Sequence, residues 1–181
     1  MLLNVRPVSV QEVLLDWGSA EATSPRFRNW DRADVIAKLR NKAPLEEADR
    51  AAIVKAIRCV RAPLLDYFFQ KPTIWFEADM PVNLLDAIWS DIFFQSDSTL
   101  ADIASRRPDI KIDGFRLEAM SGRSILVGPS LNGPWILIEG VHRCVEILRM
   151  APAAQPNAIR VLVGVCQSIT SWVRWRPSVM V

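Results

Sequence analysis

Apolar residues recur every three or four positions over several stretches of the chain, which is the spacing of one face of an α-helix. A capping box at Ser9 and Glu12 opens the first of these helices, and we expect Gly18 to end it. The same spacing predicts further helices at about 31–41, 45–60, 81–89, 100–106 and 141–150. We interpret the two helices at about 31–41 and 45–60 as part of a helical insertion, about 26–70. The insertion belongs to a single domain that spans residues 1–181.

Other apolar runs are too short for helices and are rich in β-branched residues, which favours strands. They predict an extended segment at 2–7, strands at about 73–78, 110–120, 124–128, 135–138 and 158–166, and weak alternation over 169–176. Asn132-Gly133, between two of these runs, is a signal for a hairpin. The chain is therefore expected to have an α+β fold.

The segment 135–148 is the place where polar residues able to bind phosphate interrupt two hydrophobic runs. Trp135–Ile138 predicts a buried strand, and after Gly140 the apolar residues change to helical spacing. The sequence therefore predicts a strand, a tight turn at Gly140 and a helix from about Val141 to Met150, closed by Pro152.

A helix that begins directly after a glycine presents backbone N–H groups and the positive end of its dipole. His142 and Arg143 add side-chain donors in the first turn, where a cation is disfavoured by ~0.3–1 kcal/mol unless an anion is bound. We therefore expect a phosphate site formed by Gly140, Val141, His142 and Arg143. The alternative is a structural turn followed by a solvent-facing histidine and arginine.

The run Ile138-Glu139-Gly140-Val141-His142-Arg143 resembles the Asp/Glu-Gly-x-His-Arg signature of the ParB/sulfiredoxin-like superfamily. That superfamily includes sulfiredoxins, free-serine kinases and the CTP-binding, DNA-segregating ParB proteins. The resemblance implies a small mixed sheet, to which the helical insertion is added, and a turn that grips the phosphates of ATP or CTP. Val141 stands where sulfiredoxin has its cysteine, which argues against reductase chemistry.

On this resemblance the ligand is a nucleoside triphosphate, ATP or CTP, with Mg²⁺, and the activity is that of a kinase or NTPase acting on a small-molecule acceptor. Glu139 and His142 are the candidate catalytic residues, with Glu139 as a general base or a helper in binding Mg²⁺. Arg143 would spread the developing negative charge. The alternative is a non-catalytic ParB-like module that binds DNA or a protein partner.

The overall charge and the hydrophobic pattern limit the kinds of partner that we expect the protein to bind. The sequence has 22 Lys and Arg against 20 Asp and Glu, so a net charge of +2 gives no general attraction to DNA. No apolar run reaches the roughly 18 uncharged residues of a membrane span, and the N-terminus lacks a leader pattern, so we expect a cytoplasmic protein without a membrane partner. Cys59, Cys144 and Cys166 are interpreted as buried thiols, and the single histidine excludes a His-based zinc site.

Three other stretches each leave two interpretations open. The segment 26–30, Arg-Phe-Arg-Asn-Trp, either stacks on a base and touches phosphate or closes over the core. Glu77 and Asp79, at the expected end of a strand, either have a chemical role, holding Mg²⁺ or acting as a base, or are solvated loop acids. The tryptophans and arginines of 172–176 form either a partner surface or a packed edge of the core.

Overall fold

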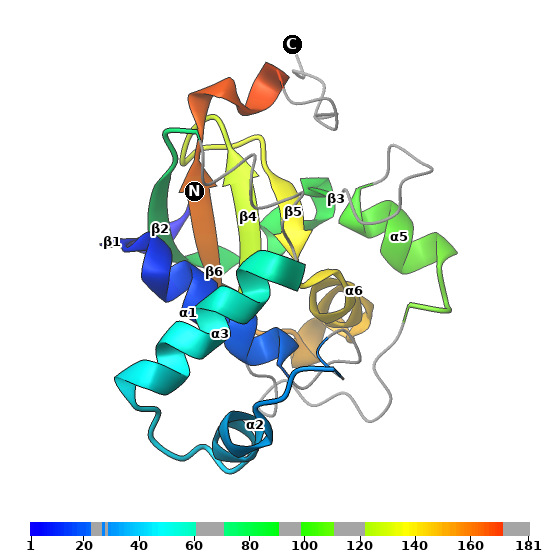
Figure 1. The fold of residues 1–181 in the computed structure, drawn as a ribbon. Coiled ribbons are helices and arrows are strands. Elements are labelled where there is room, and N and C mark those ends of the chain that lie inside the picture. Colours follow the sequence, from blue (N-terminus) through cyan, green and yellow to red (C-terminus); the bar gives the residue numbers. More distant parts are fainter. Residues whose placement is uncertain (23–26, 28, 61–70, 91–98, 111–121, 172–181) are drawn as a thin grey trace. The chain divides into compact units, whose positions relative to one another are not determined.

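A computed structural model of the chain describes residues 1–22, 27, 29–60, 71–90, 99–110 and 122–171 (Figure 1). Its contacts separate two compact units, Val8–Lys71 and the combination of Met1–Pro7 with Pro72–Val181. The first unit is helical, and the second is built on a β-sheet. The expected strands at 111–120 and the tail at 172–176 lie outside the described residues.

The helical unit contains α1 (Val10–Glu21), α2 (Ala33–Arg40) and α3 (Glu47–Val60). The predicted capping box is confirmed, since Ser9 accepts from the backbone N–H of Glu12 and the Glu12 carboxylate accepts from that of Ser9. The predicted end at Gly18 is wrong. A Cβ at Gly18 would lie 2.5 Å from Cγ2 of Ile53, so this glycine lets α1 approach α3 closely and does not end the helix.

Asp49 ties the start of α3 to α2. Its buried carboxylate accepts from Lys38 Nζ at 2.7 Å, from Arg32 Nη2 at 3.1 Å and from the backbone N–H of Glu46 at 3.1 Å. The hydrogen bond from Lys38 is the main cause that lowers the pKa of Asp49 below its ordinary value. The carboxylate therefore stays charged at neutral pH and forms ion pairs with both Arg32 and Lys38.

The second unit holds a six-stranded mixed sheet in the order β1-β2-β6-β4-β5-β3 (Figure 1). β2 pairs antiparallel with β6, and β4 with β5, whereas β4 runs parallel to β6 and β3 to β5. The expected α+β class is thus confirmed. The strands are β1 (Leu3–Val8), β2 (Ile74–Pro81), β3 (Trp89–Ser90), β4 (Ser124–Gly128), β5 (Ile136–Glu139) and β6 (Ala158–Val165).

The core of this unit lies between one face of the sheet and the helices α5 (Leu100–Arg106) and α6 (Val141–Arg149). Each fully buried aliphatic side chain in it contributes roughly 1.5–3 kcal/mol. Among the described residues, no helix is long and apolar enough to cross a membrane. The core side chains include Ala78, Met80, Leu100, Ile103, Leu126, Leu137, Val141, Cys144, Val145, Ile147, Val161 and Val163.

Two predicted elements differ from the structure. No α-helix starts at Pro81, because β2 continues to that residue opposite Ala158 of β6 and is followed by a 3-10 helix, Val82–Ala87, and the short β3. Residues Gln167–Ser171 form a 3-10 helix and not an alternating strand. In the first case the pairing with β6 decides the outcome, and local sequence does not reveal a partner so distant along the chain.

Gly18→Ala should lower the free energy of unfolding by about 1–3 kcal/mol, the usual cost of overpacking. The sign of this change in unfolding free energy is informative, because alanine is otherwise favoured over glycine inside a helix by about 1 kcal/mol. Chemical denaturation measures the change, with Ser19→Ala as the neighbouring control. A Gly18→Ala variant as stable as the wild type would contradict the close packing of α1 on α3.

Candidate functional site

The turn between β5 and α6 depends on Gly140. Its φ of +101° is a backbone conformation that residues with a side chain rarely adopt. A Cβ at this position would lie 2.5 Å from Oγ of Ser124 and 3.1 Å from Cα of Ser124. Ser124 is the buried first residue of β4. Any residue but glycine would therefore meet both backbone strain and a steric clash. The predicted strand, tight turn and helix at this point are confirmed.

The N-terminus of α6 has the features that favour an anion. No side chain caps it, and no acidic residue lies in its first turn. Such a helix start presents backbone N–H groups and a partial positive charge. Val141 is buried in the core, so only its backbone is available to a ligand. Glu139 ends β5 just before the turn, and its Oε1 accepts from the backbone N–H of Gly140 at 2.9 Å.

The side chains of His142 and Arg143 take different directions. Consecutive residues of an α-helix are rotated by about 100° from each other. His142 is exposed, whereas Arg143 is half-buried and donates from Nη1 to the backbone carbonyl of Gly122 at 2.5 Å. The structure thus brings Glu139, Gly140 and Arg143 together beside the segment that leads into β4, and it leaves His142 on the exposed side of the same turn.

Cys144, one turn into α6, is unsuited to redox or nucleophilic chemistry. Its thiol is fully buried, and Sγ lies 3.4 Å from Oγ of Ser124. Burial raises the pKa of Cys144 to about 11, so the reactive thiolate is scarce at neutral pH. Cys166 is also buried, but Cys59 is exposed, so the expectation of three buried thiols is wrong for Cys59.

Glu77 lies within β2 and not at its end, because the strand runs three residues beyond the predicted limit. Its buried carboxylate is paired with Arg6, Arg123 and Arg160. Asp79 accepts from Asn4 Nδ2 at 2.7 Å. The parts of the chain that the structure describes contain no group of three or more His, Cys, Asp or Glu able to hold a metal ion.

Sequence reasoning missed these arginines as a group. The signal that could have found them is strand periodicity, which places side chains two residues apart on one face of a sheet. Arg160 lies opposite Asp79 in the register of β2 and β6, and the next residue on that face of β2 is Glu77.

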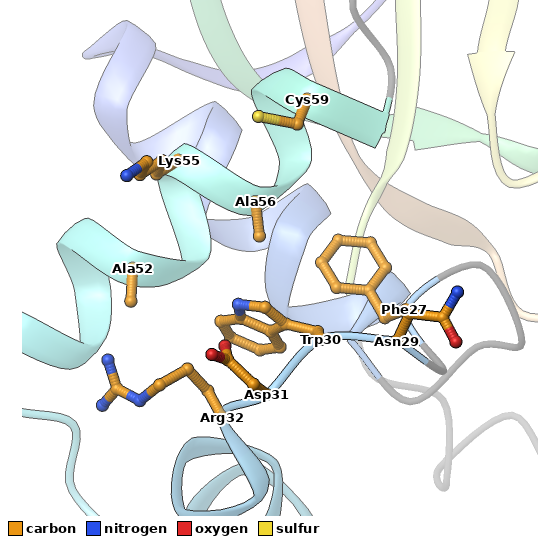
Figure 2. A pocket seen from close by; sticks show the side chains of 9 residues that line it. All are labelled: Phe27, Asn29, Trp30, Asp31, Arg32, Ala52, Lys55, Ala56 and Cys59. Atoms are coloured by element: carbon orange, nitrogen blue, oxygen red, sulfur yellow. The ribbon is translucent and has the colours of Figure 1, made fainter.

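Phe27, Asn29 and Trp30 line a groove of about 490 Å³ within the helical unit. Phe27 is buried and meets Trp30 edge to face, with ring centroids 5.6 Å apart and planes at 81°. Figure 2 shows Ala52 and Ala56 of α3 pointing toward the indole of Trp30. Phe27 therefore packs inward, whereas the half-buried Trp30 forms a wall of the groove.

Comparisons with protein-family models, curated proteins and solved structures find no match for this chain. The residues of the β5–α6 turn and their contacts therefore carry the functional argument.

Among the three cysteines, we expect only Cys59 to react with a thiol reagent near neutral pH in the folded protein. With a pKa of about 11, Cys144 has on the order of one thiolate per ten thousand molecules at pH 7. Mass spectrometry after brief labelling checks this, and Cys59→Ser should abolish the native signal. Rapid labelling of Cys144 in the native state would contradict its burial.

Proposed function

We propose that this protein binds the phosphates of a nucleoside triphosphate, ATP or CTP with Mg²⁺, at the turn from β5 to α6, as ParB/sulfiredoxin-like proteins do. The observation that carries the proposal is the start of α6 at a left-handed glycine, without a side-chain cap and without an acid in the first turn. Anions bind such helix starts because the backbone N–H groups and the dipole act together.

The surrounding residues have distinct roles in this proposal. Backbone N–H groups of Val141 and His142 bind phosphate oxygens, and the exposed His142 imidazole adds a donor from the solvent side. Arg143, held at the Gly122 carbonyl, contributes a fixed positive charge beside the turn. That charge would stabilise negative charge that develops during phosphoryl transfer.

Glu139 is the candidate for acid–base chemistry. Its carboxylate lies at the end of β5, directly before the glycine turn. Mg²⁺ in nucleotide sites is often held by one or two carboxylates together with the phosphates, so a single carboxylate is compatible with a metal–nucleotide complex. The proposed activity is phosphoryl transfer to a small hydroxyl acceptor, or hydrolysis, with Glu139 as general base or as an aid to Mg²⁺.

A second candidate is a non-catalytic ParB-like module, and the groove beside Trp30 favours it. That groove is within the size range of small-ligand sites and presents an aromatic wall together with Lys55 and Arg32. In this version the helical unit binds a protein partner or DNA, and the β5–α6 turn binds a nucleotide without turning it over.

His142→Glu gives the most informative test of the nucleotide site. A carboxylate in the first turn of α6 should stabilise the ligand-free protein by about 0.3–1 kcal/mol through the helix dipole, while repelling phosphate. We therefore expect a ligand-free melting temperature that is unchanged or slightly higher, together with loss of the thermal shift that ATP or CTP with Mg²⁺ produces in the wild type. His142→Gln, which is neutral, should retain most of the shift.

Measurements of nucleotide turnover and thermal shift together distinguish the proposed enzyme from the non-catalytic module. Turnover of the bound nucleotide that Glu139→Gln abolishes, while the thermal shift persists, would support the enzyme. A thermal shift without turnover would favour the module. No shift in the wild type with ATP, CTP, GTP or ADP, or an equal shift in His142→Glu, would overturn the nucleotide site.

A further inference from the structure

The aromatic wall of the groove in the helical unit is held in place by Phe27. This residue is buried and meets the indole of Trp30 edge to face. The backbone N–H of Trp30 donates to the carbonyl of Phe27 at 2.8 Å, so a turn fixes the indole at its base. Trp30 is nevertheless only half-buried. An apolar ring that is fixed but accessible is suited to bind a second ring, because little conformational entropy is lost on binding.

The face of α3 that lines this groove carries mostly small side chains. Four lining residues recur at the i, i+3, i+4, i+7 spacing of one helix face: Ala52, Lys55, Ala56 and Cys59. Figure 2 shows the two alanines pointing toward the indole of Trp30. A helix face that packs against a neighbour usually carries larger apolar residues. The small ones leave a space of about 490 Å³, which is within the size range of small-ligand sites.

The charged residues that line the groove indicate where a ligand's charge would bind. Arg32 is already engaged, because its guanidinium donates to Asp34 from Nε and Nη2, each at 3.0 Å, and to Asp49 at 3.1 Å. Asp31, which also lines the groove, interacts electrostatically with Arg32 as well. Lys55 is exposed and lines the groove from α3. It is therefore the cation best placed to bind an acidic group of a ligand.

A carboxylate matches this arrangement better than a phosphate or a cation does. One ammonium group balances the single charge of a carboxylate. A phosphate monoester carries a charge of about −1.5 to −2 at neutral pH, and it would meet the carboxylate of Asp31 in the same groove. A cation would be attracted to the indole face, but Lys55 and Arg32 would repel it.

We propose that this groove binds a small planar aromatic carboxylate, with its ring against Trp30 and the small face of α3 and its carboxylate at Lys55. Every residue that lines the groove belongs to the helical unit, whereas the nucleotide proposal concerns the N-terminus of α6. The two sites share no side chain, so this inference stands or fails independently of the nucleotide proposal. It also assigns the groove to a small molecule, in contrast to the protein or DNA partner of the non-catalytic module.

The test uses the exposed thiol of Cys59, which lines the groove, as a reporter. Iodoacetamide labelling of Cys59 in the full-length protein is followed by mass spectrometry at increasing concentrations of naphthoate, naphthylmethanol or naphthylmethylamine. We expect naphthoate to slow the labelling in a saturable manner and to bind about fivefold more tightly than the alcohol, the upper range for an exposed ion pair. Lys55→Gln should remove this preference and leave the affinity for the alcohol unchanged.

Two matched variants of α3 locate the binding. Ala56→Leu places a larger side chain in the groove and should weaken naphthoate binding by roughly tenfold or more, because overpacking has a cost of that size. Ala51→Leu makes the same change in a neighbouring groove that also contains Cys59, and it should leave the protection by naphthoate unchanged. Leucine is a good helix former, and circular dichroism checks that both variants fold.

Three results would overturn the proposal. The first is a lack of protection of Cys59 by all three naphthalene compounds, or tighter binding of the amine than of the carboxylate. The second is an equal loss of protection in Ala56→Leu and Ala51→Leu, which would place the ligand outside the groove. The third is protection by a single-stranded oligonucleotide but not by naphthoate, which would assign the groove to nucleic acid.

Discussion

The close approach of Gly140 to Ser124 is the contact on which the rest of the site depends. Because glycine has no side chain, the end of β5 can turn at a φ of +101° directly against the first residue of β4. That contact determines where α6 begins, and it places Cys144 against Ser124 inside the core. Arg143 then reaches back to the carbonyl of Gly122, two residues before Ser124, so the helix is attached to the same segment by two independent contacts.

The segment 122–124 connects two regions of different electrostatic character. The carbonyl of Gly122 accepts from Arg143, whereas the side chain of Arg123 pairs with Glu77 in the cluster with Arg6 and Arg160. One short segment therefore contacts both the helix start and the arginine cluster. At the start of α6 no side chain caps the backbone N–H groups and no acid lies in the first turn, and this is the basis of the proposed nucleotide site.

Local signals in the sequence predicted much of the fold. The capping box at Ser9, helical spacing in α3 and the strand, glycine turn and helix at Gly140 are encoded by residues close together in sequence, and each is confirmed. The predictions at Gly18 and Pro81 are wrong because contacts with α3 and β6, distant in sequence, decide the conformation there. At the candidate site, the residue types could be predicted, but the diverging side chains could not, since their directions depend on tertiary partners.

The central claim is tested most directly by the unfolding free energy of Gly140→Ala, alone and combined with Ser124→Gly. We predict a loss of about 1–3 kcal/mol from the strained backbone and a similar loss from the clash with Ser124. The loss caused by the clash should be smaller in the Ser124→Gly background, because the Ser124 side chain is then absent. The double-mutant cycle should therefore give a favourable coupling energy. A Gly140→Ala protein as stable as the wild type, or losses that simply add in the double variant, would contradict the close approach on which the site rests.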